Sequence, residues 1–218
     1  MTRVKICGIK TIQEAKYACD YGAWAIGEVF APSPRRISIE DALRINRQLD
    51  NSVLKIGVFV DESIERVNHV ADTCGLDMVQ LHGNETPDYV KQINKPVLKS
   101  IAVRGPVTIN FLKPWQAWGY IFDAPRPAGA KANGGNGVTF PWEWLDAIKG
   151  RQDVFLAGGL TVQNVDSAIR RVLPGGVDVS SGVEDFRGDK DAEKIAAFMA
   201  QVRETDRDMA GRGREKHE

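Results

Sequence analysis

The fold of this chain is decided near its start, where residues 3–9 read RVKICGI. Alternation of side chains along these residues predicts a short strand that stops at Gly8. A helical pattern over residues 11–22 follows at once, so the chain opens as strand, tight turn and helix. In sheets built from such units, ligands bind at the carboxyl ends of the strands. Cys7, the last residue of this strand, therefore stands where a site is expected.

The same unit recurs along the rest of the chain. Further strand patterns cover residues 25–30, 54–60, 77–83, 97–101, 120–123, 154–159 and 177–182. Helical patterns follow them at residues 38–49, 63–74, 86–93, 106–114, 142–148, 161–172 and 190–203. Parallel strands joined by right-handed crossovers predict a single-domain eight-fold β/α barrel over residues 1–203.

Two further features bound this prediction. The alternative architecture is a doubly wound open sheet, which requires a Gly-rich dinucleotide loop after the first strand, and Gly8-Ile9-Lys10 is not such a loop. Residues 204–218 are charged and have no apolar periodicity, so they are predicted to form a disordered, solvated tail.

Composition excludes several classes of protein. Among 218 residues, 29 Lys and Arg balance 29 Asp and Glu, which argues against nucleic-acid or membrane-surface binding. Three scattered cysteines form neither a disulfide framework nor a zinc motif. The chain shows no signal peptide and no apolar run of membrane-spanning length. We therefore expect a cytoplasmic protein, and the sequence leaves monomer and homodimer both open.

The loops after the seventh and eighth strands predict an anion site. Many barrels bind phosphate there through backbone N–H groups, and glycine allows the anion to approach closely. No lysine or arginine cluster is adjacent in the sequence, so oriented amides are expected to supply the affinity. Gly135 and Gly137, after the sixth strand, extend the cradle. Its other members are Gly158, Gly159, Ser180, Ser181 and Gly182.

The remaining strand ends carry side chains suited to proton transfer or to charge recognition. Cys7 is either a base or a small core residue, and Asp123 is either an acid or a turn residue. Arg35 lies in a Pro-stiffened loop, where it could hold a carboxylate or a phosphate, although a solvated arginine is the simpler interpretation. We assign His82 to substrate binding, with a structural histidine and an acid–base group as alternatives.

Two lysines are expected inside the protein. Alternation places Lys5 and Asp178 on the inward face of adjacent first and eighth strands, which predicts a buried ion pair. Lys99 lies in mid-strand, which is a poor position for a Schiff-base nucleophile, and an interior ion pair is the better interpretation.

Taken together, the ordered motifs closely resemble those of phosphoribosylanthranilate isomerases of tryptophan biosynthesis. They lie at residues 5–9, 33–35, 57–60, 80–83, 134–137, 156–160 and 177–184. The resemblance runs from residue 3 to about residue 202. It implies a single-domain barrel without cofactor or metal that carries out an Amadori rearrangement of a phosphosugar substrate, N-(5-phosphoribosyl)anthranilate.

The resemblance also implies roles for individual residues. Cys7 corresponds to the general base and Asp123 to the general acid. Arg35 corresponds to an arginine that faces the anthranilate end of the substrate, and the glycine and serine loops correspond to the phosphate site. The sequence departs from the family pattern mainly at Glu28, at Arg36 and Asn136, and in residues 186–188. An inward Glu28 carboxylate would need a partner.

Three rival interpretations are weighed against this one. Another phosphosugar isomerase or lyase would share the anion site but not the pair formed by Cys7 and Asp123. The related histidine-pathway isomerase would favour an Asp at position 7. A non-catalytic phosphate-binding barrel would tolerate the loss of either residue, and both are present.

Overall fold

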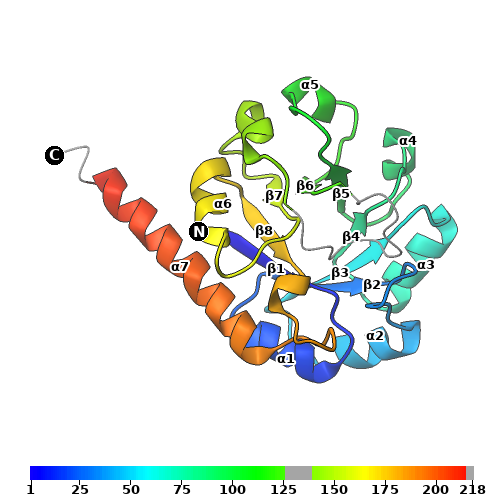
Figure 1. The fold of residues 1–218 in the computed structure, drawn as a ribbon. Coiled ribbons are helices and arrows are strands. Elements are labelled where there is room, and N and C mark those ends of the chain that lie inside the picture. The colour runs from blue at the N-terminus through cyan, green and yellow to red at the C-terminus, as the bar shows by residue number, and fades with distance from the viewer. Residues whose placement is uncertain (126–138, 215–218) are drawn as a thin grey trace.

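A computed structural model of this protein describes residues 1–125 and 139–214. Its parallel strands close into a barrel, in which each strand pairs with the next and β8 pairs with β1 (Figure 1). The strands are β1 (Arg3–Cys7), β2 (Ala25–Val29), β3 (Leu54–Phe59), β4 (Met78–Leu81), β5 (Val97–Ala102), β6 (Gly119–Asp123), β7 (Val154–Leu156) and β8 (Gly176–Val179). The predicted eight-fold barrel is confirmed, and the open sheet is excluded.

Helices surround the strands (Figure 1). They are α1 (Ile12–Asp20), α2 (Ile39–Asn46), α3 (Ile64–Thr73), α4 (Pro87–Val90), α5 (Ile109–Leu112), η1 (Trp142–Ile148), α6 (Val165–Val172), η2 (Ser181–Val183) and α7 (Ala192–Arg214). The hydroxyls of Thr11, Ser38 and Ser63 begin the first three helices by accepting a backbone N–H. The segment after β6 forms a 3₁₀ helix, η1.

The last helix continues beyond the predicted barrel boundary. α7 ends at Arg214, so the prediction of a disordered tail is wrong for residues 204–214, and residues 215–218 lie outside the described part. Thr205 is fully buried and donates a hydrogen bond to Asp166 at 2.9 Å. Asp206 accepts two hydrogen bonds from Thr2. These anchors join segments far apart in sequence, so local composition did not reveal them.

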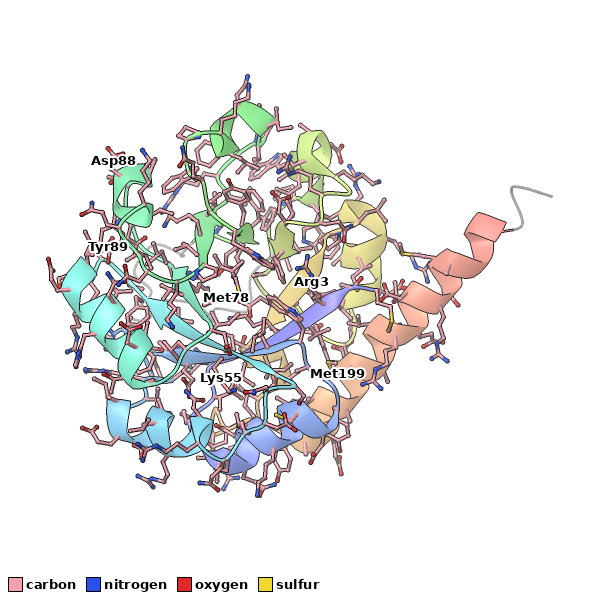
Figure 2. All side chains as sticks on the ribbon, turned by 180° about the vertical axis from the view of Figure 1, so that it is seen from behind. Arg3, Lys55, Met78, Asp88, Tyr89 and Met199 are labelled. Carbon is pink, nitrogen blue, oxygen red and sulfur yellow. The ribbon has the colours of Figure 1, made fainter. Side chains whose placement is uncertain are left out.

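Most of the hydrophobic core lies between the barrel and its helices, and a smaller cluster fills the barrel itself. At the amino-terminal end, the Arg3 guanidinium lies 4.8 Å from the ring centroid of Phe155 and 5.3 Å from those of Trp24 and Trp118. In Figure 2 the labelled side chains of Arg3 and Met78 lie near the middle of the barrel. This end is closed by side chains, which leaves the opposite end for a site.

The Glu28 side chain does not point into the barrel, contrary to the inward orientation considered from the sequence. Gly27 is the residue paired with Cys7, so Gly27 faces inward and Glu28 faces the helices. There Asn46 of α2 donates a hydrogen bond to Glu28 Oε2 at 3.0 Å, while Oε1 has no partner among the described residues. Burial raises the pKa of Glu28 to about 7, against the opposing effects of Asn46 and Lys55.

Both lysine ion pairs that the sequence predicted are present. Lys5 Nζ lies 2.9 Å from Asp178 Oδ1, with Lys5 fully buried inside the barrel. Lys99 Nζ lies 2.7 Å from Glu85 Oε2 and is also buried, but it faces away from the barrel axis. Among the described residues no helix is long and apolar enough to cross a membrane.

Candidate active site

The carboxyl ends of the strands surround a cavity of about 440 Å³. The structure brings most of the predicted site residues to it: Cys7, Arg35, His82, Asp123, Gly158, Gly159, Ser180 and Ser181. Gly182 follows Ser181 but does not line the cavity, and Gly135 and Gly137 lie outside the described residues. No three His, Cys, Asp or Glu side chains in the described part are placed to hold a metal ion.

Cys7 enters the cavity from the end of β1. Its neighbours on the inner wall include the apolar side chains of Val29, Ala31 and Val58. Burial raises the pKa of the Cys7 thiol, and the nearby Lys5 ammonium is the strongest influence in the opposite direction. Cys7 is therefore a cavity-lining thiol with a cation beside it, rather than a member of the main hydrophobic core.

Asp123 enters the same cavity from the end of β6. Burial, and then the negative charge of Asp178, raises the pKa of Asp123 to about 7. A Cβ at position 158 would lie 2.8 Å from Asp123 Oδ1, and Gly158 also has a positive φ of 86°. The glycine therefore both shapes the turn after β7 and leaves space for the carboxyl. A carboxyl with this pKa retains its proton on a fraction of molecules at neutral pH, as a general acid requires.

His82 lies beside this carboxyl. Its Nε2 is 3.5 Å from Asp123 Oδ2, and its Nδ1 is 3.1 Å from Gln80 Nε2. Burial lowers the pKa of His82 to about 4, so the ring is neutral at physiological pH. Because the Gln80 amide donates to Nδ1, the remaining ring proton is assigned to Nε2, on the side of Asp123. His82 thus contributes a neutral hydrogen-bond donor to the cavity wall.

Arg35 is held in place, contrary to the interpretation of a solvated arginine. Its Nε and Nη2 donate to the two carboxylate oxygens of Glu184 at 2.6 and 2.7 Å. Lys190 Nζ lies 2.5 Å from Glu184 Oε1, the oxygen that also accepts from Arg35 Nε. Burial acts to raise the pKa of Glu184, but Arg35 and Lys190 outweigh it and hold this pKa at about 2. The fixed guanidinium faces the cavity.

Sequence reasoning missed two members of this cluster. Glu184 is the last residue of the motif at residues 177–184, but the motif does not indicate its role because its partner Arg35 is 149 residues away. Lys190 is a cation near the loop after β8, which the sequence pattern did not indicate. Its Nζ lies 3.2 Å from both the carbonyl and the hydroxyl oxygen of Ser180. The sequence indicates no cluster of Lys or Arg near this loop, yet the fold brings one cation to it, and Glu184 balances the charge of that cation.

The two predicted anion loops lie side by side. Gly159 has a positive φ of 62°, and a Cβ at Gly182 would collide with the carbonyl oxygen of Leu160. Neither the N–H of Gly159 nor that of Gly182 donates a backbone hydrogen bond within the described residues. Close contact between the loops thus requires glycine at 182, and Gly159, which lines the cavity, has an N–H with no backbone acceptor among the described residues.

Comparison with known proteins agrees with this geometry. The family model described as N-(5'phosphoribosyl)anthranilate (PRA) isomerase matches residues 4–201. The chain belongs to the phosphoribosylanthranilate isomerase family. A relative from Syntrophomonas wolfei subsp. wolfei, named N-(5'-phosphoribosyl)anthranilate isomerase, is 50% identical over 204 residues, which are 94% of this chain and 98% of the relative.

Solved structures of the phosphoribosylanthranilate isomerase family match as well. The crystal structure from Thermotoga maritima has a TM-score of 0.84 and 38% identity, and the match covers 93% of this chain and 99% of that one. A phosphoribosyl anthranilate isomerase in complex with reduced 1-(o-carboxyphenylamino)-1-deoxyribulose 5-phosphate has a TM-score of 0.78 and 35% identity, with the same coverage. As a member of this family, the protein is an enzyme.

Proposed function

We propose that this protein catalyses the Amadori rearrangement of N-(5-phosphoribosyl)anthranilate to 1-(2-carboxyphenylamino)-1-deoxy-D-ribulose 5-phosphate, a step of tryptophan biosynthesis. Membership of the isomerase family supports the reaction. The observation that carries the mechanism is the shared cavity of Cys7 and Asp123, since one is a potential base and the other a carboxyl whose pKa is about 7. We assign Asp123 as the general acid and Cys7 as the general base.

The proposed steps conserve every atom of the substrate. Asp123 donates its proton to the furanose ring oxygen, and the bond from that oxygen to C1 breaks as the anthranilate nitrogen forms a C1=N double bond. The Cys7 thiolate then removes the proton from C2, and the electron pair of that bond forms a C1=C2 enolamine with a neutral nitrogen. The enol hydroxyl at C2 loses its proton while C1 gains one, which gives the ketone.

We assign the two charged groups of the substrate to different groups around the cavity. The solved relative binds a reduced product analogue with a carboxylate on one end and a phosphate on the other. In this chain we assign Arg35 to the carboxylate, because its guanidinium is already oriented by Glu184. We assign the phosphate to the backbone N–H groups around Gly159 and Gly182. His82, which follows β4, supplies a donor beside Asp123.

The experiment that tests this function is a direct assay. Freshly prepared N-(5-phosphoribosyl)anthranilate is mixed with the purified protein, and loss of its anthranilate fluorescence is followed against a protein-free sample, which corrects for spontaneous decay. We expect rapid loss with the protein and formation of the isomer by chromatography. Equal decay rates in both samples, with correctly folded protein, would contradict the proposed function.

A further inference from the structure

Lys5 lies directly beneath the thiol that we assign as the base. Both side chains point into the barrel because they are two residues apart on β1. Lys5 is fully buried, and Asp178 keeps it charged: burial acts to lower the pKa of Lys5, but Asp178 and Cys7 raise it overall. A charged ammonium therefore sits next to the Cys7 sulfur, although the chemistry proposed above assigns it no role.

Gly27 explains how the ammonium and the sulfur come together. It is the residue of β2 paired with Cys7, and a Cβ there would lie 2.8 Å from both Cys7 Sγ and Lys5 Nζ. The two atoms thus cannot be further apart than twice that distance. The φ of Gly27 is not in the left-handed region, so the backbone itself does not require glycine here. The missing side chain provides the space in which these two groups meet.

The other charges around Cys7 do not replace Lys5. Burial against the apolar wall of the cavity disfavours a thiolate most, and the charge of Asp178 disfavours it further. Lys190 favours a thiolate more weakly than Lys5 does, and both Lys190 and Arg35 are paired with Glu184. Of the charged groups that face the sulfur in the described part of the chain, Lys5 makes the largest favourable contribution.

We propose that Lys5 is a positioning residue that stabilises Cys7 as a thiolate for removal of the C2 proton, and that Gly27 is required because it keeps the ammonium and the sulfur together. This inference rests on the proposed function, because it concerns the base of that reaction. Thiolate is the reactive form of cysteine, so the pairing would determine how much active enzyme is present at neutral pH. It also gives the Lys5–Asp178 pair a role beyond satisfying two buried charges.

The test measures ionisation of Cys7 without substrate. In a Cys19→Ala background, the rate of alkylation of Cys7 by iodoacetamide is followed from pH 6 to pH 10 by peptide mass spectrometry. An opposite charge at this range moves a pKa by about one to three units. We therefore expect Lys5→Gln and Gly27→Ala to raise the midpoint by about one unit or more and to slow alkylation at pH 7.5 by about tenfold.

Gly57→Ala is the matched control. Gly57 is also a strand glycine with no room for a Cβ, but its neighbours Leu76 and Phe30 lie behind the sheet. We expect this variant to lose stability and to keep the alkylation midpoint of the parent. A merely structural role for Gly27 predicts the same behaviour for Gly27→Ala, so an unchanged midpoint in a folded Gly27→Ala protein would overturn the proposal.

Two outcomes need separate treatment. Lys5→Gln removes the partner of the Asp178 charge. If that variant does not fold, the alkylation midpoint of Gly27→Ala by itself tests the proposal. If the midpoint shifts as expected but the parent protein has no isomerase activity, the proposed function fails while the pairing of Lys5 with Cys7 stands. With an active parent, kcat/KM at neutral pH falls in Gly27→Ala by a factor similar to the fall in alkylation rate. An unchanged kcat/KM alongside a shifted midpoint would remove the thiolate from catalysis.

Discussion

The mouth of the barrel and the layer between β2 and α2 each hold a carboxyl whose pKa is raised to about 7. Asp123 reaches this value through burial and the charge of Asp178, and Glu28 reaches it mainly through burial. Asp123 lines the open cavity, whereas Glu28 is completely inaccessible and contacts Asn46. Desolvation therefore makes Asp123 a candidate general acid, whereas in Glu28 it only makes the stability of the fold depend on pH. Access to a ligand makes the difference.

The largest expected effect separates the two carboxyls by activity. Asp123→Asn should lower kcat by about 10²–10⁴-fold, the usual contribution of one positioned acid or base, and Cys7→Ser should act similarly because a hydroxyl ionises far less readily than a thiol. Glu28→Gln, the control, should retain kcat because no substrate reaches it. Steady-state assays at saturating substrate measure this. A normal kcat in Asp123→Asn would remove that residue from the mechanism.

The second expected effect is on stability, and here Glu28 rather than Asp123 is the residue that is tested. The pKa of Glu28 is raised from 4.5 to about 7 in the folded protein, so the folded state binds the proton more tightly than the unfolded state. Protonation of Glu28 therefore adds to the free energy of unfolding. This contribution is fully present below about pH 4.5 and is lost as the pH rises to about 7, which lowers the free energy of unfolding by roughly 3 kcal/mol. Glu28→Gln should remove this dependence and be more stable than the parent at pH 8.

Urea unfolding at pH 5 and pH 8 measures that difference. Asp123 has the same sign of shift, so it also weakens the folded state as the pH rises, and a residual slope is expected in Glu28→Gln until Asp123→Asn is added. A Glu28→Gln protein with the full pH dependence of the parent would show that the buried carboxyl is not protonated in the folded state.

A smaller effect distinguishes substrate binding from proton transfer at the mouth. Arg35→Lys replaces a two-point contact with Glu184 by a single ammonium, which cannot also present a planar fork to a substrate carboxylate. We expect KM to rise by about tenfold, or about 1.4 kcal/mol, with a smaller change in kcat. Lys91→Arg at the exposed surface is the control. A fall in kcat with an unchanged KM would assign Arg35 to the chemical step instead.

The smallest expected effect tests whether the hydrogen bond from Asn46 stabilises the buried Glu28 carboxyl. Asn46 Nδ2 donates both to Glu28 and to the carbonyl of Cys74, at 3.0 and 3.1 Å. Asn46→Ala should lower the free energy of unfolding by about 1 kcal/mol. Because the lost hydrogen bond holds the pKa of Glu28 down, the pH window of lost stability should extend above 7. Unfolding curves at pH 7 and pH 9 test this shift, and kcat should not change.

Much of the architecture could be predicted because its signals are local. Alternation along each strand indicates which side chains face inward, and together with the adjacency of the first and eighth strands in a closed barrel it anticipated the pair formed by Lys5 and Asp178. The order of strands and helices indicated a barrel, and closure brings every strand end to one mouth. The positions of Cys7 and Asp123 at that mouth followed from the same pattern, and the resemblance to a family added their expected roles.

What only the tertiary structure decided are the partners of these residues. Arg35 meets Glu184, Gly27 gives Lys5 and Cys7 a common space, and Thr205 anchors the middle of α7 to Asp166 of α6. Each of these contacts joins separate elements of the fold, so no periodic pattern along the chain records it. Burial likewise determines the pKa of Asp123, because desolvation depends on everything packed around the carboxyl. Sequence alone determined where the reactive groups stand, and the closed barrel decides which charges surround them.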